Sequence, residues 1–170
     1  MPRIALAALL LAFATPLFAA DITPDSVLSE MNSYRAKQGL APLHFDPRLV
    51  LAAGDRMQDM EDLAYWSHDA PDGRSPFTWL KPRGYDFRFA GENLATGFET
   101  VELLVQGWME SPGHRANIMS PDYDDVGIAV IDGSTTHRAT GKSVVVMFGR
   151  SVRPHGLPDQ RRASIPSDHR

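Results

Sequence analysis

The stretch from Ala90 to Pro121 reads AGENLATGFETVELLVQGWMESPGHRANIMSP and combines a helical apolar pattern with a dense set of polar side chains. Thr100 is a good N-cap for a helix that reaches Met109, and one face of this helix carries Val101, Leu104, Val105 and Trp108. Ser111-Pro112-Gly113 breaks it, and residues 114–119 are predicted as a single helical turn. Four Glu, a His, an Arg and two Asn lie in this stretch, so binding or proton transfer is expected here.

Upstream of this stretch, the sequence predicts two longer helices. The first is capped by Thr23-Pro24 and ends at Gly39, and the second begins at Asp46-Pro47 and runs to Leu63. Residues 41–45 form an extended connector, and residues 65–74 form a loop. A short helix follows Ser75-Pro76, and residues 87–95 are predicted to be extended.

Downstream, two β-branched runs predict strands over Val126–Ile131 and Ser143–Phe148, joined by a long polar hairpin loop over residues 132–142. Helices first, then antiparallel strands with a helix between them, indicate an α+β fold. Because the strands are apolar on both faces, we expect a three-layer α–β–α sandwich with a central, mainly antiparallel sheet.

Composition narrows the function classes. The chain has 170 residues, a formal net charge of −4 and no cysteine. The absence of cysteine excludes disulfides, thiol catalysis and Cys-ligated metals. The acidic balance argues against a nucleic-acid partner, whose phosphates demand a basic face.

The two ends of the chain are expected to lie outside the folded domain. Residues 1–20 have a short basic start, an apolar run and a small-residue cleavage site at Ala19-Ala20, a pattern typical of a secretory signal peptide. We therefore expect export to the periplasm or the extracellular medium, with no integral membrane segment after cleavage. Residues 151–170 hold three prolines and few large apolar side chains, which predicts a flexible tail and leaves 21–150 as the domain.

Of the six histidines, His68 and His114 are the candidates for a site. Each lies in a segment punctuated by Gly and Pro, where an irregular backbone can aim a side chain inward. Neutral imidazoles with carboxylates suit zinc and similar divalent ions. The alternative is that both merely bond the backbone of their own loops. His44 is interpreted as structural, and the remaining histidines as exposed.

Two glutamates could complete such a site. Glu92 follows a glycine that permits close backbone approach, and Glu110 sits at a helix C-terminus, where an acid opposes the macrodipole. Asn93, Arg115 and Asn117 are the supporting candidates. No convincing nucleophile, P-loop or dinucleotide fingerprint is present.

The motifs GENLATGF, VQGWMESPGHRANIM and PDYDDVGIAV resemble the bacterial branch of the CAP superfamily of SCP-like domains. The N-x-x-R-x-x-x-G-L-x-P-L pattern of residues 32–43 and SHDAPDGRSPF at residues 67–77 fit the same family, so the resemblance spans residues 27–148. It implies an α–β–α sandwich and a cleft with two His and two acids, which in some members holds a divalent metal such as zinc. His68, Glu92 and His114 match three of these positions. The family's fourth acid falls at Ser111, one residue after Glu110.

The resemblance leaves three functions open. The first is an exported binding or interaction module of the cell envelope or secretome, whose cleft holds a metal or small ligand, or whose surface meets an envelope component or a protein. The second is a metal-assisted hydrolase, with His68 and His114 on the metal and a Glu activating water. The third is a lipid-binding protein.

Overall fold

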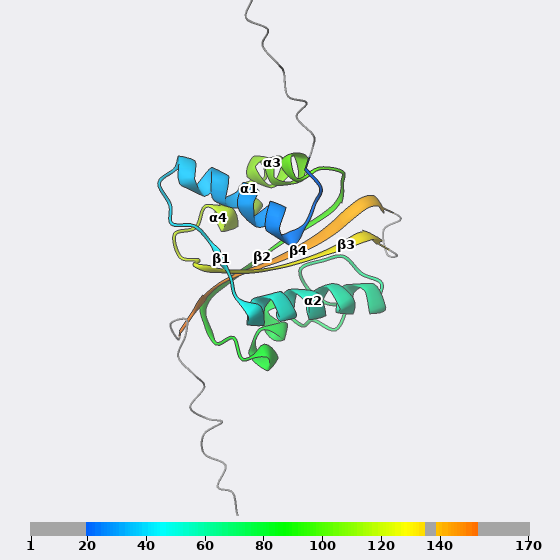
Figure 1. The fold of residues 1–170 in the computed structure, drawn as a ribbon. Helices are drawn as coiled ribbons and strands as arrows, with labels where there is room; N and C mark the ends of the chain where they lie inside the picture. The colour runs from blue at the N-terminus through cyan, green and yellow to red at the C-terminus, as the bar shows by residue number, and fades with distance from the viewer. Residues whose placement is uncertain (1–19, 135–138, 153–170) are drawn as a thin grey trace, which may run out of the picture.

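The fold is a four-stranded sheet between two helical layers, as the sequence predicts. A computed structural model describes residues 20–134 and 139–152. The strand order is β1-β3-β4-β2, and all pairs are antiparallel except the short parallel pair of β1 with β3. Helices α1, α3 and α4 cover one face of the sheet, and α2 covers the other (Figure 1). No helix in the described ranges is long and apolar enough to cross a membrane.

Capping residues set where the helices begin. The side chain of Thr23 accepts a hydrogen bond from the Ser26 N–H at the start of α1 (Pro24–Lys37), and Asp46 accepts one from the Arg48 N–H at the start of α2 (Pro47–Asp62). Thr100 caps α3 (Val101–Glu110) in the same way. Two short 3-10 helices, η1 (Pro76–Trp79) and η2 (Lys81–Arg83), lie on the α2 side.

The strands are longer than predicted. β1 (His44–Phe45) is short, but β2 (Phe87–Phe98), β3 (Asp125–Ser134) and β4 (Ala139–Ser151) are all extended. The predicted hairpin loop over 132–142 is therefore wrong at both ends, because Asp132 pairs with Lys142 and Ser134 with Ala139 across a bulge. Polar side chains suggested a loop there, but the backbone ladder continues regardless of side-chain polarity.

Two other boundaries need correction. The helical turn expected from residue 114 instead begins at Pro112, as α4 (Pro112–Ile118), because proline is well suited to the first helical position. β4 extends to Ser151, and the Val152 N–H bonds the Asp86 carbonyl, so the folded part passes residue 150. The predicted signal peptide, apart from Ala20, and the tail from residue 153 lie outside the described residues.

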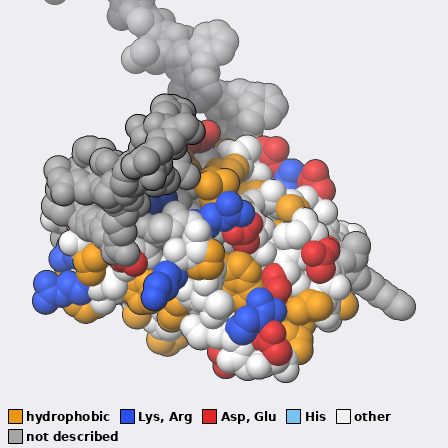
Figure 2. Space-filling model, turned by 90° about the horizontal axis from the view of Figure 1, so that it is seen from below, with side chains coloured by type: hydrophobic (Ala, Val, Ile, Leu, Met, Phe, Trp, Pro, Cys, Tyr) orange, Lys and Arg blue, Asp and Glu red, His pale blue; other side chains and the backbone are white. Residues whose placement is uncertain are grey.

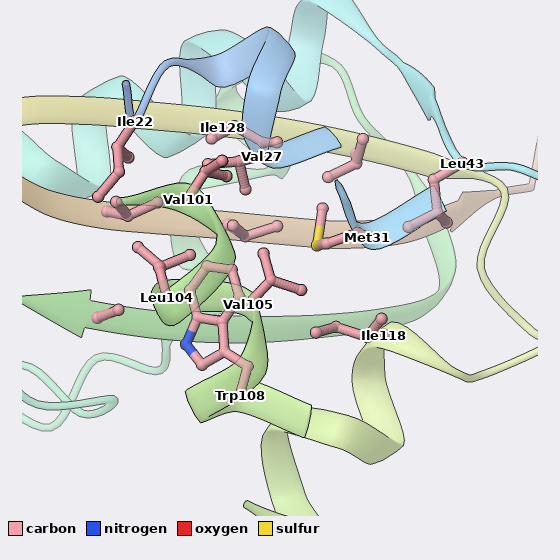
Figure 3. Packing of buried hydrophobic residues seen from close by; sticks show 14 of the residues in the cluster. Ile22, Val27, Met31, Leu43, Val101, Leu104, Val105, Trp108, Ile118 and Ile128 are labelled. Carbon is pink, nitrogen blue, oxygen red and sulfur yellow. The ribbon is translucent and has the colours of Figure 1, made fainter. Parts of the chain in front are cut away.

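The core consists of two clusters, one on each face of the sheet. Side chains of α1 and α3, Trp108 among them, converge with those of the sheet on one face (Figure 3). Leu49, Met57 and Met60 of α2 form the other cluster. The VVVMF run of β4 alternates between the two clusters, which explains why both of its faces are apolar.

Gly127 lets α2 rest directly on the sheet. A Cβ at this position would lie 2.0 Å from the Leu49 carbonyl carbon. Because backbone atoms cannot swing aside as a side chain does, only glycine fits here. The close contact fixes the α2 layer against β3.

Candidate functional site

The candidate site lies at β2, the edge strand of the sheet. Successive side chains of a strand point to opposite faces, so those of Glu92 and Asn93 lie on opposite sides of the sheet. Glu92 meets Arg56 of α2, whereas Asn93 donates to the carbonyl of His114 in α4 (3.1 Å). One dipeptide therefore ties together the two helical layers that carry His68 and His114.

A buried ion pair supports the α2 side. The Arg56 Nε donates to Glu92 Oε2 at 3.0 Å, and the two side chains are 0% and 1% exposed. Arg56 also donates to Tyr65 Oη and to the carbonyls of Ser67 and His68, and its guanidinium lies 4.7 Å from the Trp79 ring centroid. Arg56 thus holds both the carboxylate and the loop that carries His68.

Tyr65 is fixed in the same network. Its hydroxyl donates to Asp59 Oδ2 at 2.5 Å while it accepts from Arg56. Burial and the hydrogen bond to Asp59 raise the pKa of Tyr65 to about 12. The phenol therefore stays neutral at physiological pH.

His68 is oriented by Glu92 and open to solvent. Its Nδ1 lies 2.8 Å from Glu92 Oε1, and its side chain is 57% exposed. The hydrogen bond to Glu92 raises the pKa of His68, and the charges of Glu92 and Asp69 act in the same direction against partial burial and Arg56. The Nδ1 proton faces Glu92, so Nε2 is the ring nitrogen left for a ligand.

The pKa of His114 is shifted in the opposite direction. His114 is half-buried, and its ring centroid lies 6.5 Å from that of Trp108. Burial lowers the pKa of His114, and the charge of His68 lowers it further. The surroundings of the two imidazoles therefore push their pKa values apart.

Side chains from α3, α4 and the following turn cover the outer edge of β2. The Asn117 Nδ2 donates to the Glu92 carbonyl (3.0 Å) and to Asn93 Oδ1 (2.8 Å). Trp108 Nε1 donates to the Leu94 carbonyl, and the Tyr123 hydroxyl donates to the Ala90 carbonyl. These bonds satisfy alternate carbonyls of an edge strand and fix α4, and with it His114.

Gly91 makes this close approach possible. A Cβ there would lie 2.6 Å from Tyr123 Oη and 2.8 Å from Asn117 Oδ1. The glycine of the GEN motif is thus required by the packing of α4 and Tyr123 against β2.

Two of the predicted site residues lie apart from this group. Glu110 is exposed and accepts a hydrogen bond from Gln106 one turn earlier (2.9 Å). It lines a surface hollow of about 350 Å³ together with Arg115, Met109 and Met119. The structure therefore brings together His68, Glu92, Asn93, His114 and Asn117, and places Glu110 and Arg115 elsewhere.

The described side chains do not by themselves supply three ligands for a divalent metal. The described residues include no group of three or more His, Cys, Asp or Glu able to hold a metal ion. Both oxygens of Glu92 already accept hydrogen bonds, and the charge of Arg56 balances that of the carboxylate. Two imidazoles alone are one fewer than the protein ligands of a usual catalytic zinc. The metal expectation stays a prediction.

Sequence reasoning missed Arg56, the residue that organises the His68 side. The signal was a charged residue within the apolar stripe of α2, where Ala52, Ala53 and Met60 occupy the same face. A charge on a buried helical stripe is almost always paired, so it indicates a buried acid nearby. Tyr123 gave no comparable signal.

The fold and the edge site define a class of proteins, the SCP-like α–β–α domains. A family model described as the cysteine-rich secretory protein family, CAP, matches residues 28–148. The chain belongs to this family.

Two relatives from Bacillus subtilis (strain 168) are similar in sequence. An uncharacterized protein, YkwD, is 39% identical over 118 residues, which is 68% of this chain and 46% of YkwD. An uncharacterized membrane protein, YlbC, is 34% identical over 104 residues, 61% of this chain and 30% of YlbC. The chain thus spans less than half of either relative.

Solved structures show the same fold. An outer surface protein from Borrelia burgdorferi superposes with a TM-score of 0.66 at 23% identity, covering 79% of this chain and 99% of that one. An extracellular SCP-domain protein from Bacillus anthracis gives a TM-score of 0.62 at 26% identity, covering 78% and 45%.

Proposed function

We propose that this chain is an exported binding module whose two-histidine site recognises an acidic group, such as a carboxylate or sulfate, on a small ligand or envelope component. The observation that carries the proposal is the chain of contacts from Arg56 through Glu92 to His68. Arg56 and Glu92 cancel in charge, so protonation of His68 gives the three groups a net charge of +1. Such a site attracts an anion and repels a cation.

Each side chain has a distinct part in this proposal. His68, held by Glu92 through Nδ1, offers Nε2–H as a charge-assisted donor to a ligand oxygen. His114 tends toward the neutral form and supplies an uncharged polar partner. Export is supported by the descriptions of relatives as outer surface and extracellular proteins. The hydrolase and lipid-binding alternatives stay predictions from the sequence.

The test is a pair of titrations followed through the histidine ring signals by NMR, one with sodium sulfate and one with zinc chloride, at constant ionic strength. We expect sulfate to bind weakly, on the order of millimolar, through His68. Binding should be roughly tenfold tighter where His68 is protonated than where it is neutral, and it should weaken as the pH rises through the raised pKa of His68. His68→Gln should remove the response, and His44→Gln, which changes an exposed histidine in β1, should not.

Zinc would show the opposite pH dependence, because protons compete with a metal for imidazole. Micromolar zinc binding that is lost near pH 6 and abolished by either His68→Gln or His114→Gln would overturn the anion proposal in favour of a metal site. A sulfate response that is independent of pH, or unchanged in His68→Gln, would also contradict it.

A further inference from the structure

Two surface hollows adjoin on the face of the sheet that α1, α3 and α4 cover (Figure 1). Each has a volume of about 350 Å³. Both are lined by Met109, Arg115 and Met119, so these three side chains form the wall between them. The first, the α1 hollow, is completed by Tyr34, Lys37 and Gln38, and the second, the α4 hollow, by Glu110, Pro112 and Ala116.

The shared wall carries a cation without a counter-charge. Arg115 is exposed, and its guanidinium makes no hydrogen bond or ion pair with any residue in the described ranges. Lys37 lies in the α1 hollow with its Nζ 4.8 Å from the Tyr34 ring centroid, and it too has no acidic partner in that part of the chain. No acid lines the α1 hollow. A carboxylate bound there would therefore meet two cations whose charges nothing else in the hollow balances.

The rest of the wall is apolar and adaptable. Met109 and Met119 are half-buried and pack against the core cluster beneath them. A methionine side chain is unbranched and polarisable, so it fits apolar groups of different shapes. The planar guanidinium of Arg115 between them is suited to a carboxylate, which it binds through two parallel hydrogen bonds. The arrangement therefore fits a ligand with one carboxylate and two apolar groups beside it.

We propose that these two hollows bind the C-terminal end of an apolar peptide. Its free α-carboxylate pairs with Arg115 and Lys37, its last side chain occupies the α1 hollow, and the side chain before it occupies the α4 hollow. Glu110 lines only the α4 hollow and repels a carboxylate, which places the charged end of the peptide on the α1 side. A peptide end presents two side chains next to its carboxylate, whereas a linear acyl chain has a single apolar arm and would leave one hollow empty.

Three small probes test the ligand class on the full chain with carbon-13 in its methionine methyl groups. They are acetyl-Leu-Leu with a free carboxylate, the same dipeptide as its C-terminal amide, and decanoate. We expect the dipeptide acid to shift the NMR signals of Met109 and Met119 with a Kd on the order of millimolar. The amide should bind at least roughly tenfold more weakly, because it loses the charge-assisted hydrogen bonds to Arg115.

The same titrations define the results that would overturn the proposal. Equal binding of the dipeptide acid and its amide would show that no cation reads the carboxylate. Decanoate binding as tight as that of the dipeptide acid would assign the hollows to an acyl chain instead. The absence of any shift at both Met109 and Met119 with the dipeptide acid would exclude the site itself.

Arg115→Met tests the charge, and Arg88→Met is its matched control. Arg88 is also exposed, and its guanidinium lies 5.4 Å from the Phe89 ring centroid without an acidic partner in the described ranges. Arg115→Met should weaken binding of the dipeptide acid by at least roughly tenfold and leave the weaker binding of the amide unchanged. Arg88→Met should change neither. Equal effects of the two substitutions would contradict a role for Arg115.

Ala116→Trp tests the α4 hollow. Ala116 is exposed, so the indole ring fills the hollow from the surface without entering the core. Leu51→Trp is the control, because Leu51 is 53% exposed on α2 in the opposite layer. Ala116→Trp should weaken binding of the dipeptide acid by roughly tenfold, while Leu51→Trp leaves it unchanged and both variants keep a urea midpoint close to that of wild type. Full affinity in Ala116→Trp would refute the placement of the second side chain.

Discussion

Replacing Arg56 with methionine tests the role of the buried ion pair most directly. Methionine is shorter than arginine but matches the aliphatic part of its side chain, and it removes the charge and every donor. Glu92, which is 1% exposed in its side chain, would then be a buried carboxylate without its counter-charge. The carbonyls of Ser67 and His68 would lose their donor at the same time.

The expected cost follows from this burial. Removing one partner of a buried ion pair costs about 3–5 kcal/mol, because the remaining charge keeps its desolvation penalty. Domains of this size have a free energy of unfolding of about 5–15 kcal/mol, so Arg56→Met should fold but unfold at a much lower urea concentration. Adding Glu92→Gln removes the buried charge, and the double variant should recover about half of the loss.

Urea unfolding of the full chain, followed by tryptophan fluorescence, measures these differences. Arg83→Met is the matched control, because Arg83 pairs with Asp55 through two contacts of 2.6 Å but lies at the surface. Several basic side chains lie directly beside acidic ones on the α2 face (Figure 2), and such exposed pairs contribute little. The reasoning fails if Arg56→Met loses no more stability than Arg83→Met, or if Glu92→Gln makes Arg56→Met worse.

Three further predictions concern the site and the packing beneath it. In an NMR titration, His68 should titrate above and His114 below the ordinary value of about 6.5, and identical titration curves would contradict this. The stability that His68 adds is therefore full below about pH 6.5 and is lost as the pH rises through its folded pKa, whereas His114 reduces stability below about pH 6.5. Gly127→Ala should destabilise by about 1–3 kcal/mol or more in urea unfolding, because its Cβ would strike the Leu49 backbone, while Gly113→Ala should cost nothing. Trp108→Phe should cost about 1–3 kcal/mol, because the Leu94 carbonyl loses its donor; a midpoint within error of wild type would refute this.

The sequence predicted the helices well because their signals are local. Thr23, Asp46 and Thr100 all cap where expected, since a side chain that accepts from the first turn is identified by its neighbours alone. Strand ends were predicted less well. The polar ends of β3 and β4 pair with each other, and a pairing between distant segments leaves no mark in either segment taken alone.

The candidate site, like the fold, could be predicted from the sequence only in part. The family resemblance supplied His68, Glu92 and His114. The structure brings the Glu92 carboxylate to His68, and the charge of His68 contributes to the lowered pKa of His114. The resemblance did not supply Arg56, whose role depends on α2 lying opposite β2. Glu110 was a candidate because of its place at the helix C-terminus, although the family's fourth acid falls at Ser111. Its position in the helix could not show which neighbour it meets, and the structure leaves it exposed beside Gln106.

The position of the site at a sheet edge explains how two opposed layers can share it. His68 comes from the α2 side and His114 from the α4 side, and a central strand would keep them apart. At the edge strand β2 the layers meet. Asn117 of α4 donates to the Glu92 carbonyl and to the Asn93 side chain, and Asn93 in turn donates to the carbonyl of His114. The same set of hydrogen bonds therefore covers the edge of β2 and positions His114.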